Sequence, residues 1–248
     1  MPDDDAKTRI EERHARLRAM SLLELGRHFG TDKATTHRYL GHYERHFAHF
    51  KNHVMNLLEI GIGGSTRAGQ GGSSLRMWKW FFPKAAIVGL DIVNKEFVRR
   101  TRIDTYQGSQ DDEALLRRIH EEKGPFRIII DDGSHRSEHV RESFRVLFPL
   151  LEEGGLYVIE DTQTSYWPEY GGSEDRSSPN TMMGMVKDLV DGLNYVEFID
   201  DDYLPSYSDL NVSAVHCYHN LVFIEKGPNS EPTHKHRILR KRYARTEE

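Results

Sequence analysis

Between residues 54 and 225 the chain alternates short apolar runs with longer amphipathic segments. Short runs rich in β-branched residues predict buried strands, and apolar residues at helical spacing predict helices that cover them. The predicted strands are 54–60, 85–91, 103–107, 126–131 and 155–160, with two more near 195–199 and 213–225 joined by a long loop. The predicted helices are 73–81, 111–121, 136–151 and 180–193. This alternation is typical of an α/β fold with a Rossmann-like, doubly wound, mostly parallel sheet of seven strands.

The segment before the first predicted strand has a helical pattern. After a largely charged start, apolar residues from Leu17 to Leu25 mark an amphipathic helix. Gly30 and the residues after it break this helix, and a second helix is predicted at roughly 37–50. We therefore expect an N-terminal helical extension, a sheet-containing domain and a basic C-terminal tail, delimited as 1–52, 53–228 and 229–248.

Two of the predicted strands end in pairs of acids. Asp131 and Asp132 close one strand, and Glu160 and Asp161 close the next strand along the chain. If these strands are neighbours, their ends lie about 5 Å apart. Carboxylates that close resist joint ionisation, and a bound Mg2+ relieves the repulsion because it prefers carboxylate oxygens. The pattern predicts a metal-assisted catalytic site, with His135 placed to move a proton.

A glycine turn follows the first predicted strand and contains Gly61 and Gly63. A dinucleotide fingerprint would need a glycine at position 66, which is Thr66, and Glu59 would repel a pyrophosphate. S-adenosylmethionine carries a sulfonium and an amino group, so a carboxylate there favours its binding. Asp91 ends the second predicted strand, where an acid can bind both ribose hydroxyls. Together these residues predict an S-adenosylmethionine site; separately, each also fits a structural turn or a helix cap.

Two further segments border the expected cofactor site. Ser73 follows a second glycine-rich stretch and is interpreted either as a cofactor contact or as part of a helix N-cap. Gly108 and Ser109 follow the third predicted strand, where an adenine ring would lie. Asp111 and Asp112 are expected in the first turn of the next helix.

Composition narrows the class of protein. The 248 residues include 29% charged and 37% hydrophobic residues, which fits a soluble globular chain. The net charge of −5 does not favour nucleic acid as a partner, and no apolar run is long enough to span a membrane. The single cysteine, Cys217, rules out an internal disulfide and suits the cytoplasm. A homodimer is our first hypothesis because of the amphipathic N-terminal helices, and the basic run 234–245 is interpreted as a solvated or oligomer-docking tail.

Over roughly residues 22–165 the sequence resembles the class I S-adenosylmethionine- and Mg2+-dependent sugar O-methyltransferases, among them macrolide deoxysugar and mycobacterial mannoside O-methyltransferases. Several motifs, in order, carry this resemblance: FGTDK at 29–33, HRYLGHYERHF at 37–47, LLEIGIGG at 57–64, GGSSLRMW at 71–78, DDGSH at 131–135 and IEDT at 159–162. The glycine motif alone is generic, whereas the pairing of DDGSH with IEDT is much more specific.

The resemblance implies methyl transfer from S-adenosylmethionine to a hydroxyl of a sugar or glycoside. The family's metal ligands fall on Asp132, Glu160 and Asp161, its general base falls on His135, and Asp131 faces the cofactor. The chemistry agrees, because a bound cation lowers the pKa of a hydroxyl and a nearby histidine can then accept its proton.

Several of these residues could instead have purely structural roles. The turn after Asp131 could cap the next helix, and His139 could be a substrate or second-sphere residue or a surface histidine. Tyr166 and Trp167 could stack on a sugar or simply pack in a loop. The segment Thr31–Lys33 could form a flap over the cofactor or a helix-breaking turn.

Alternative functions also remain. A His-x-x-Glu-His pattern at 135–139 occurs in some zinc peptidases, but here it begins at a strand end rather than within a helix. A metal-dependent hydroxylase similar to cephalosporin hydroxylase shares the acid pattern. A non-catalytic S-adenosylmethionine-binding scaffold is the third alternative. Oxygen consumption identifies the hydroxylase, and tolerance of His135→Ala identifies the scaffold.

Overall fold

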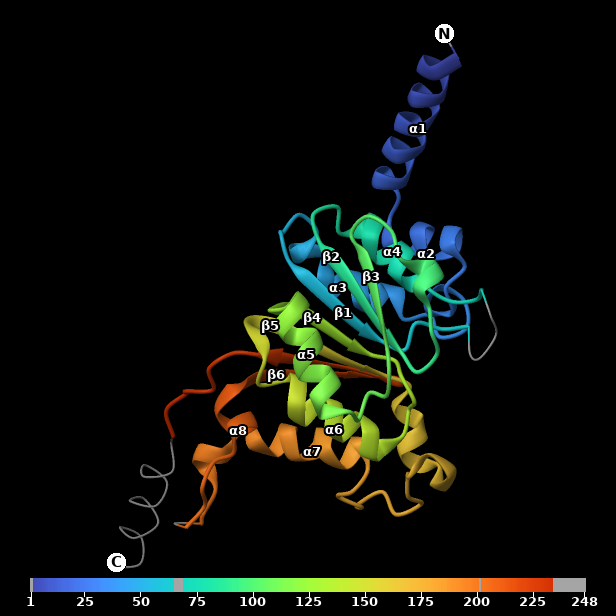
Figure 1. Ribbon diagram of the computed structural model, residues 1–248. Coiled ribbons are helices and arrows are strands. Elements are labelled where there is room, and N and C mark those ends of the chain that lie inside the picture. Colours follow the sequence, from blue (N-terminus) through green and yellow to red (C-terminus); the bar gives the residue numbers. More distant parts are fainter. Residues whose placement is uncertain (1, 65–68, 201, 234–248) are drawn as a thin grey trace, which may run out of the picture. The chain divides into compact units, whose positions relative to one another are not determined.

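The computed structural model describes residues 2–64, 69–200 and 202–233 of a chain that forms two compact units, Met1–Ser134 and His135–Glu248 (Figure 1). The basic run 234–245 lies outside the described residues. The division into an extension, a sheet domain and a tail stays a prediction. Among the helices that the structure describes, none combines the length and the apolar character needed to cross a bilayer.

Four parallel strands form the sheet of the first unit. They are β1 (Asn56–Ile60), β2 (Ala86–Asp91), β3 (Ile103–Gln107) and β4 (Phe126–Asp131), in the order β3-β2-β1-β4. Residues of β1 and β4 are buried almost throughout, as expected for strands covered on both faces. In the register of this pair, Ile60 lies opposite Asp131. The sheet therefore brings the ends of β1 and β4 together, and all four strand predictions for this unit are confirmed.

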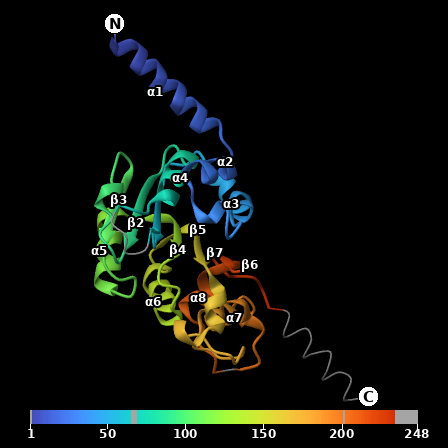
Figure 2. The same cartoon turned by 90° about the vertical axis from the view of Figure 1, so that its right-hand side faces the viewer.

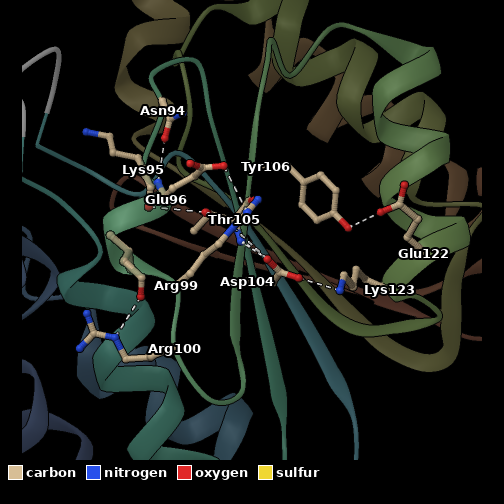
Figure 3. Close-up of polar contacts among 11 residues, drawn as sticks. Asn94, Lys95, Glu96, Arg99, Arg100, Asp104, Thr105, Tyr106, Glu122 and Lys123 are labelled. Atoms are coloured by element: carbon tan, nitrogen blue, oxygen red, sulfur yellow. Dashed lines mark hydrogen bonds and ion pairs between the residues drawn. The ribbon is translucent and has the colours of Figure 1, made fainter.

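A polar network lines strand β3, at the edge of this sheet (Figure 3). Arg99 donates hydrogen bonds to the backbone carbonyl and the hydroxyl of Thr105, and its Nε lies 3.1 Å from Asp104 Oδ1. Lys123 forms an ion pair with the same aspartate at 2.6 Å. These charged side chains occupy a strand edge that would otherwise offer unpaired backbone groups to another strand.

The helices of the first unit are α1 (Pro2–Ala19), α2 (Leu22–Phe29), α3 (Leu40–Phe47), α4 (Ser73–Phe81) and α5 (Glu113–Lys123). The helix predicted through Leu17 and Leu25 is in fact two helices, because Ser21 caps α2 through a capping box with Glu24. Gly30, in a left-handed conformation, ends α2 at the predicted break. The second predicted helix consists of α3 and a short 3-10 turn.

The N-terminal helices α2 and α3 pack against α4, with aromatic contacts between α3 and α4. Helix α2 packs against α3 and α4, and Figure 2 shows these three helices grouped together. Tyr43 and Phe47 of α3 contact Trp78 of α4 at ring-centroid distances of 5.1 and 5.6 Å. All three side chains are fully buried. This packing positions the turn after α2, which carries the Thr31–Lys33 segment.

The second unit contains three strands, β5 (Leu151–Glu160), β6 (Val212–Tyr218) and β7 (Leu221–Lys226), in the antiparallel order β5-β7-β6. Strand β5 starts four residues before its predicted start at 155. The strand predicted at 195–199 is wrong, because Tyr195–Glu197 forms a 3-10 turn. The strand predicted at 213–225 is two strands, since Asn220 has φ 61° and turns the chain between them.

Helices α6 (Ser137–Leu147), α7 (Met182–Gly192) and α8 (Tyr207–Asn211) belong to the second unit (Figure 1). Helix α7 packs against α6, α8 and β6. Its N-cap, Thr181, accepts a hydrogen bond from the backbone of Gly184 at 2.9 Å. The predicted alternation of strands and helices is thus confirmed, and the α/β class with it.

Candidate active site

The turn after β1 has the backbone geometry that only glycine adopts readily. Gly61 and Gly63 have φ values of 77° and 74°. A Cβ atom on Gly61 would lie 2.0 Å from the carbonyl oxygen of Asp132, and the Asp132 N–H donates to Ile60 O at 2.9 Å. The structure therefore brings the predicted cofactor turn directly against the backbone of a predicted metal ligand.

Glu59 precedes this turn and is completely buried. Within the described residues, neither of its carboxylate oxygens accepts a hydrogen bond of good geometry. Burial raises the pKa of Glu59 to about 7, and the nearby Lys33 ammonium opposes that rise. A buried carboxylate with unfilled acceptor capacity fits the cationic amino group of S-adenosylmethionine.

Lys33 links Glu59 to Asp132. Its Nζ lies 3.3 Å from Glu59 Oε1 and 2.5 Å from Asp132 Oδ2, and the lysine side chain is only 1% exposed. The sequence allowed either a flap or a turn for the Thr31–Lys33 segment. In the structure this segment leads into the 3-10 turn Asp32–Ala34, and Thr31 and Lys33 are both buried. No sequence pattern indicated that this lysine reaches two acids of the candidate site.

Asp91 is held at the end of β2 by two backbone donors. Its Oδ2 accepts from Ile62 N–H at 3.2 Å and its Oδ1 from Val93 N–H at 2.9 Å. Its carbonyl accepts from Gly108 N–H at 3.0 Å. Two residues predicted to contact the cofactor, Asp91 and Gly108, are therefore neighbours.

The remaining cofactor-side predictions have local partners. Ser109 donates to the carboxylate of Asp111, and Ser73 Oγ accepts from Arg76 at 3.2 Å. The N-cap of α4 is Gly72, so the capping interpretation of Ser73 is not supported. The cofactor roles of Ser73 and Ser109 stay predictions.

Gln110 organises the loop that carries Asp131. Its Nε2 donates to the two carboxylate oxygens of Asp131 at 2.9 and 3.2 Å, and its Oε1 accepts from Ser134 N–H at 2.6 Å. A Cβ on Gly133 would lie 2.1 Å from that Oε1. Sequence reasoning missed this role, because Gln110 belongs to no motif and reaches the loop only through the fold.

In the second unit, His135 and Asp161 lie close together. His135 Nε2 is 3.7 Å from Asp161 Oδ2. Both residues have left-handed backbones, with φ values of 56° and 53°, which are rare for residues other than glycine and cluster at functional sites. The N-cap of α6 is Arg136, and its side chain makes no capping hydrogen bond in the described structure, so the acids before it are not a helix cap.

Thr164 contacts the backbone of both residues. Its Oγ1 lies 2.7 Å from His135 O and 3.1 Å from Asp161 O. Sequence reasoning missed Thr164 as well, although it lies only three residues after Asp161.

Other predicted site residues of the second unit have clear locations but untested roles. Glu160 is buried at the end of β5, and His139 Nε2 lies 3.7 Å from Glu138 Oε1. Tyr166 and Trp167 are 43% and 44% exposed, which leaves surface for a ligand to cover. Their ligand and substrate roles stay predictions. The zinc-peptidase pattern is not within one helix, because α6 starts at Ser137.

Known proteins similar to this chain include named O-methyltransferases. The chain is 46% identical over 217 residues to mycinamicin VI 2''-O-methyltransferase of Micromonospora griseorubida, a match that covers 86% of this chain and 54% of that protein. It is 48% identical over 213 residues to demethylmacrocin O-methyltransferase of Streptomyces fradiae, with coverage of 85% and 54%. The chain thus spans about half the length of the curated relatives it matches. No protein-family model matches the chain.

A solved structure shares the fold. The crystal structure of the MycE methyltransferase from the mycinamycin biosynthetic pathway, in complex with Mg and SAH, superposes with a TM-score of 0.83 at 46% identity. The match covers 87% of this chain and 57% of that one. A further structure of that enzyme also contains mycinamycin VI. The shared fold confirms the Rossmann-like class predicted from the sequence.

Proposed function

We propose that this chain, as a homologue of the macrolide and tetracenomycin sugar O-methyltransferases, transfers a methyl group from S-adenosylmethionine to a hydroxyl of a sugar or glycoside. The observation that carries this proposal is the TM-score of 0.83 and 46% identity with a methyltransferase structure that contains Mg and SAH. The chain spans about half the length of these relatives, so their activity is a proposal for this chain that needs its own test.

The first unit offers the residues for the methyl donor. Glu59, buried and with unfilled acceptor capacity, would bind the amino group of S-adenosylmethionine. Asp91, held by two backbone N–H groups, would accept hydrogen bonds from the ribose hydroxyls. The turn at Gly61 and Gly63 allows close approach of the ligand to the backbone. Ser73, Gly108, Ser109 and Asp131 are the other residues that we propose contact the donor.

The metal would be Mg2+, held by Asp132, Glu160 and Asp161. Carboxylate oxygens are the hard ligands that Mg2+ prefers, and the side chains of Asp132 and Asp161 are 20% and 13% exposed, so each is accessible from solvent. A bound Mg2+ would supply positive charge that favours loss of the proton from a sugar hydroxyl.

His135 would then act as general base. Its Nε2 would take the proton of the sugar hydroxyl as that oxygen bonds to the donor's methyl group, and the methyl–sulfur bond would break to release S-adenosylhomocysteine. The carboxylate of Asp161 lies 3.7 Å from this nitrogen. Tyr166 and Trp167 offer exposed aromatic faces for the apolar side of a sugar, and His139 is a further candidate for substrate contact.

The test is formation of S-adenosylhomocysteine by the purified chain with candidate glycosides, with Mg2+ and then with excess chelator. We expect turnover that the chelator abolishes. Asp161→Ala should lose turnover while S-adenosylhomocysteine binding, measured by calorimetry, largely survives. Full activity in that variant would contradict the metal assignment. Oxygen consumption would favour the hydroxylase alternative, and binding without turnover would favour the scaffold.

We also propose a cytoplasmic location and a homodimer, and we expect neither nucleic acid nor a membrane as a partner. The single cysteine supports the cytoplasmic location, and the net charge of −5 supports the expectation that nucleic acid is not a partner. Light scattering of the purified chain measures the oligomeric state directly, and a monomer at all concentrations would contradict the dimer.

A further inference from the structure

Thr164 lies in a 3-10 turn, Thr162–Tyr166, that directly follows the end of β5. Its side chain is buried, at 2% exposure. The single hydroxyl hydrogen faces two carbonyl acceptors, His135 O at 2.7 Å and Asp161 O at 3.1 Å. One buried donor thus serves the backbone of the proposed base and of a proposed metal ligand.

His135 and Asp161 both have backbone conformations that are unfavourable for residues other than glycine. His135 and Asp161 have φ values of 56° and 53°, and such conformations in residues other than glycine persist only where the surroundings hold them. Both side chains start from these backbones, so a change of φ at either residue moves the imidazole relative to the carboxylate.

Thr164 is itself held from both sides. Its backbone N–H donates to Asp161 O at 3.2 Å, which closes the turn after β5. The next residue, Ser165, accepts a hydrogen bond from Met183 N–H of helix α7 at 3.2 Å through its hydroxyl. The hydroxyl of Thr164 is therefore mounted on a segment fixed to a strand and to a helix.

We propose that Thr164 is a positioning residue, whose hydroxyl holds the backbones of His135 and Asp161 so that the base and the metal-binding carboxylate keep their relative placement. This inference rests on the proposed function for the roles of those two residues. It predicts that loss of the hydroxyl weakens Mg2+ binding and slows turnover through the backbones of His135 and Asp161.

The experiment compares Thr164→Val, which keeps the shape but removes the donor, with Thr164→Ser, which keeps the donor. For Thr164→Val we expect the Kd for Mg2+, measured by calorimetry without donor or acceptor, to rise about tenfold, as for outer partners of metal ligands. We expect kcat at saturating Mg2+ to fall on the order of 10- to 100-fold, with KM for S-adenosylmethionine unchanged. Thr164→Ser should restore both quantities to within about threefold of the unmodified chain.

Thr181→Val is the matched control. Thr181 is also a buried threonine of the second unit, and it caps α7 through its hydroxyl. Its loss should lower the melting temperature and raise the Kd for Mg2+ much less than Thr164→Val does, because its hydroxyl hydrogen-bonds to Ser178 O and Gly184 N–H and to neither His135 nor Asp161. An equal loss of Mg2+ affinity in both valine variants would overturn the proposal in favour of general destabilisation.

Two other results would also overturn it: a Thr164→Val chain whose Kd for Mg2+ and kcat equal those of the unmodified chain, or a Thr164→Ser chain as impaired as a folded Thr164→Val chain. If Thr164→Val does not fold, Thr164→Ala takes its place, and the same serine comparison applies. An unmodified chain that binds Mg2+ but never transfers methyl groups would contradict the proposed function instead, and the Mg2+ affinities of the variants would still test the role of Thr164.

Discussion

Glu59 shows how one buried carboxyl group can set the conditions for cofactor binding. Burial raises its pKa to about 7, so the group changes its charge within the range in which enzymes are usually assayed. In the proposed cofactor site, only the ionised form would attract the amino cation of S-adenosylmethionine or S-adenosylhomocysteine. The affinity for either ligand should therefore depend on pH through this one residue.

The sign of this dependence follows from the raised pKa. At pH 6 most Glu59 groups are neutral and at pH 8 most are ionised, so the affinity for S-adenosylhomocysteine should rise with pH, by up to about tenfold across this range. Calorimetric titration at several pH values measures this effect. In Glu59→Gln the profile should be flat and the affinity low; an unchanged slope in that variant would show that another group is responsible.

Lys33 should matter for stability as well. Lys33→Met leaves Glu59 and Asp132 without their shared cation, and breaking a buried ion pair costs about 3–5 kcal/mol. The loss should be larger at pH 8 than at pH 6, because protonation of Glu59 at the lower pH removes one of the uncompensated charges. Urea unfolding at the two pH values measures the free energy of unfolding.

Lys123→Met provides the comparison for Lys33→Met. Lys123 pairs with Asp104 at 2.6 Å, but both side chains are about a third exposed, so its loss should cost below about 1 kcal/mol. If both variants lose the same small amount at both pH values, the buried pair contributes no more than a surface pair.

At the scale of the element, the turn after β1 tolerates change at one glycine and not at another. A Cβ on Gly61 would lie 2.0 Å from Asp132 O, whereas a Cβ on Gly63 meets no described atom within 4 Å. Both glycines have positive φ. The two alanine variants thus separate a backbone collision from conformational strain alone.

Gly63→Ala should lower the free energy of unfolding by about 1–2 kcal/mol, the cost of a left-handed alanine. Gly61→Ala should cost more than that and should also weaken S-adenosylhomocysteine binding, because β1 and β4 must separate to admit the methyl group. Urea unfolding and calorimetry on the two variants measure this. Equal losses of stability in both would mean that the collision is relieved without cost.

The elements of the first unit were predictable because each is specified locally. Strands β1, β2 and β4 are mostly apolar, β3 alternates buried with more exposed residues, and Gly30 marks the end of α2, whereas the cap Ser21 that separates α1 from α2 was not recognised. The predictions failed where a short apolar segment could form either a strand or another element, and where a turn depends on a single residue. The β6–β7 turn depends on one left-handed asparagine, Asn220, and the apolar residues near 195 form a 3-10 turn instead of a strand.

The proximity of His135 to Asp161 could be predicted, because each residue follows the end of a predicted strand in a short motif. Lys33, Gln110 and Thr164 reach their partners across 99, 21 and 29 residues of chain. Such contacts depend on how α2, β3 and β5 are placed by the fold, which no local pattern encodes.

For the molecule as a whole, ligand binding should appear as added stability. A ligand present at 100 times its Kd stabilises the folded state by about 2.7 kcal/mol. For a chain of this length that corresponds to a rise of about 5–10 °C in melting temperature. We expect S-adenosylhomocysteine to produce this shift in the unmodified chain, measured by calorimetry, and a smaller shift in Glu59→Gln at the same concentration. No shift at saturation would contradict binding to the folded state.

The strand order of the second unit has a consequence for biosynthesis. Strand β7, Leu221–Lys226, lies between β5 and β6 although it comes last of the three along the chain. Until β7 has been synthesised, the edges of β5 and β6 that pair with it stay unpaired. Chaperones or other chains can bind these edges while the nascent chain is still on the ribosome. A premature stop codon before Leu221 should therefore yield product that is cleared by proteolysis or lost to inclusion bodies, even though every proposed catalytic group has already been translated.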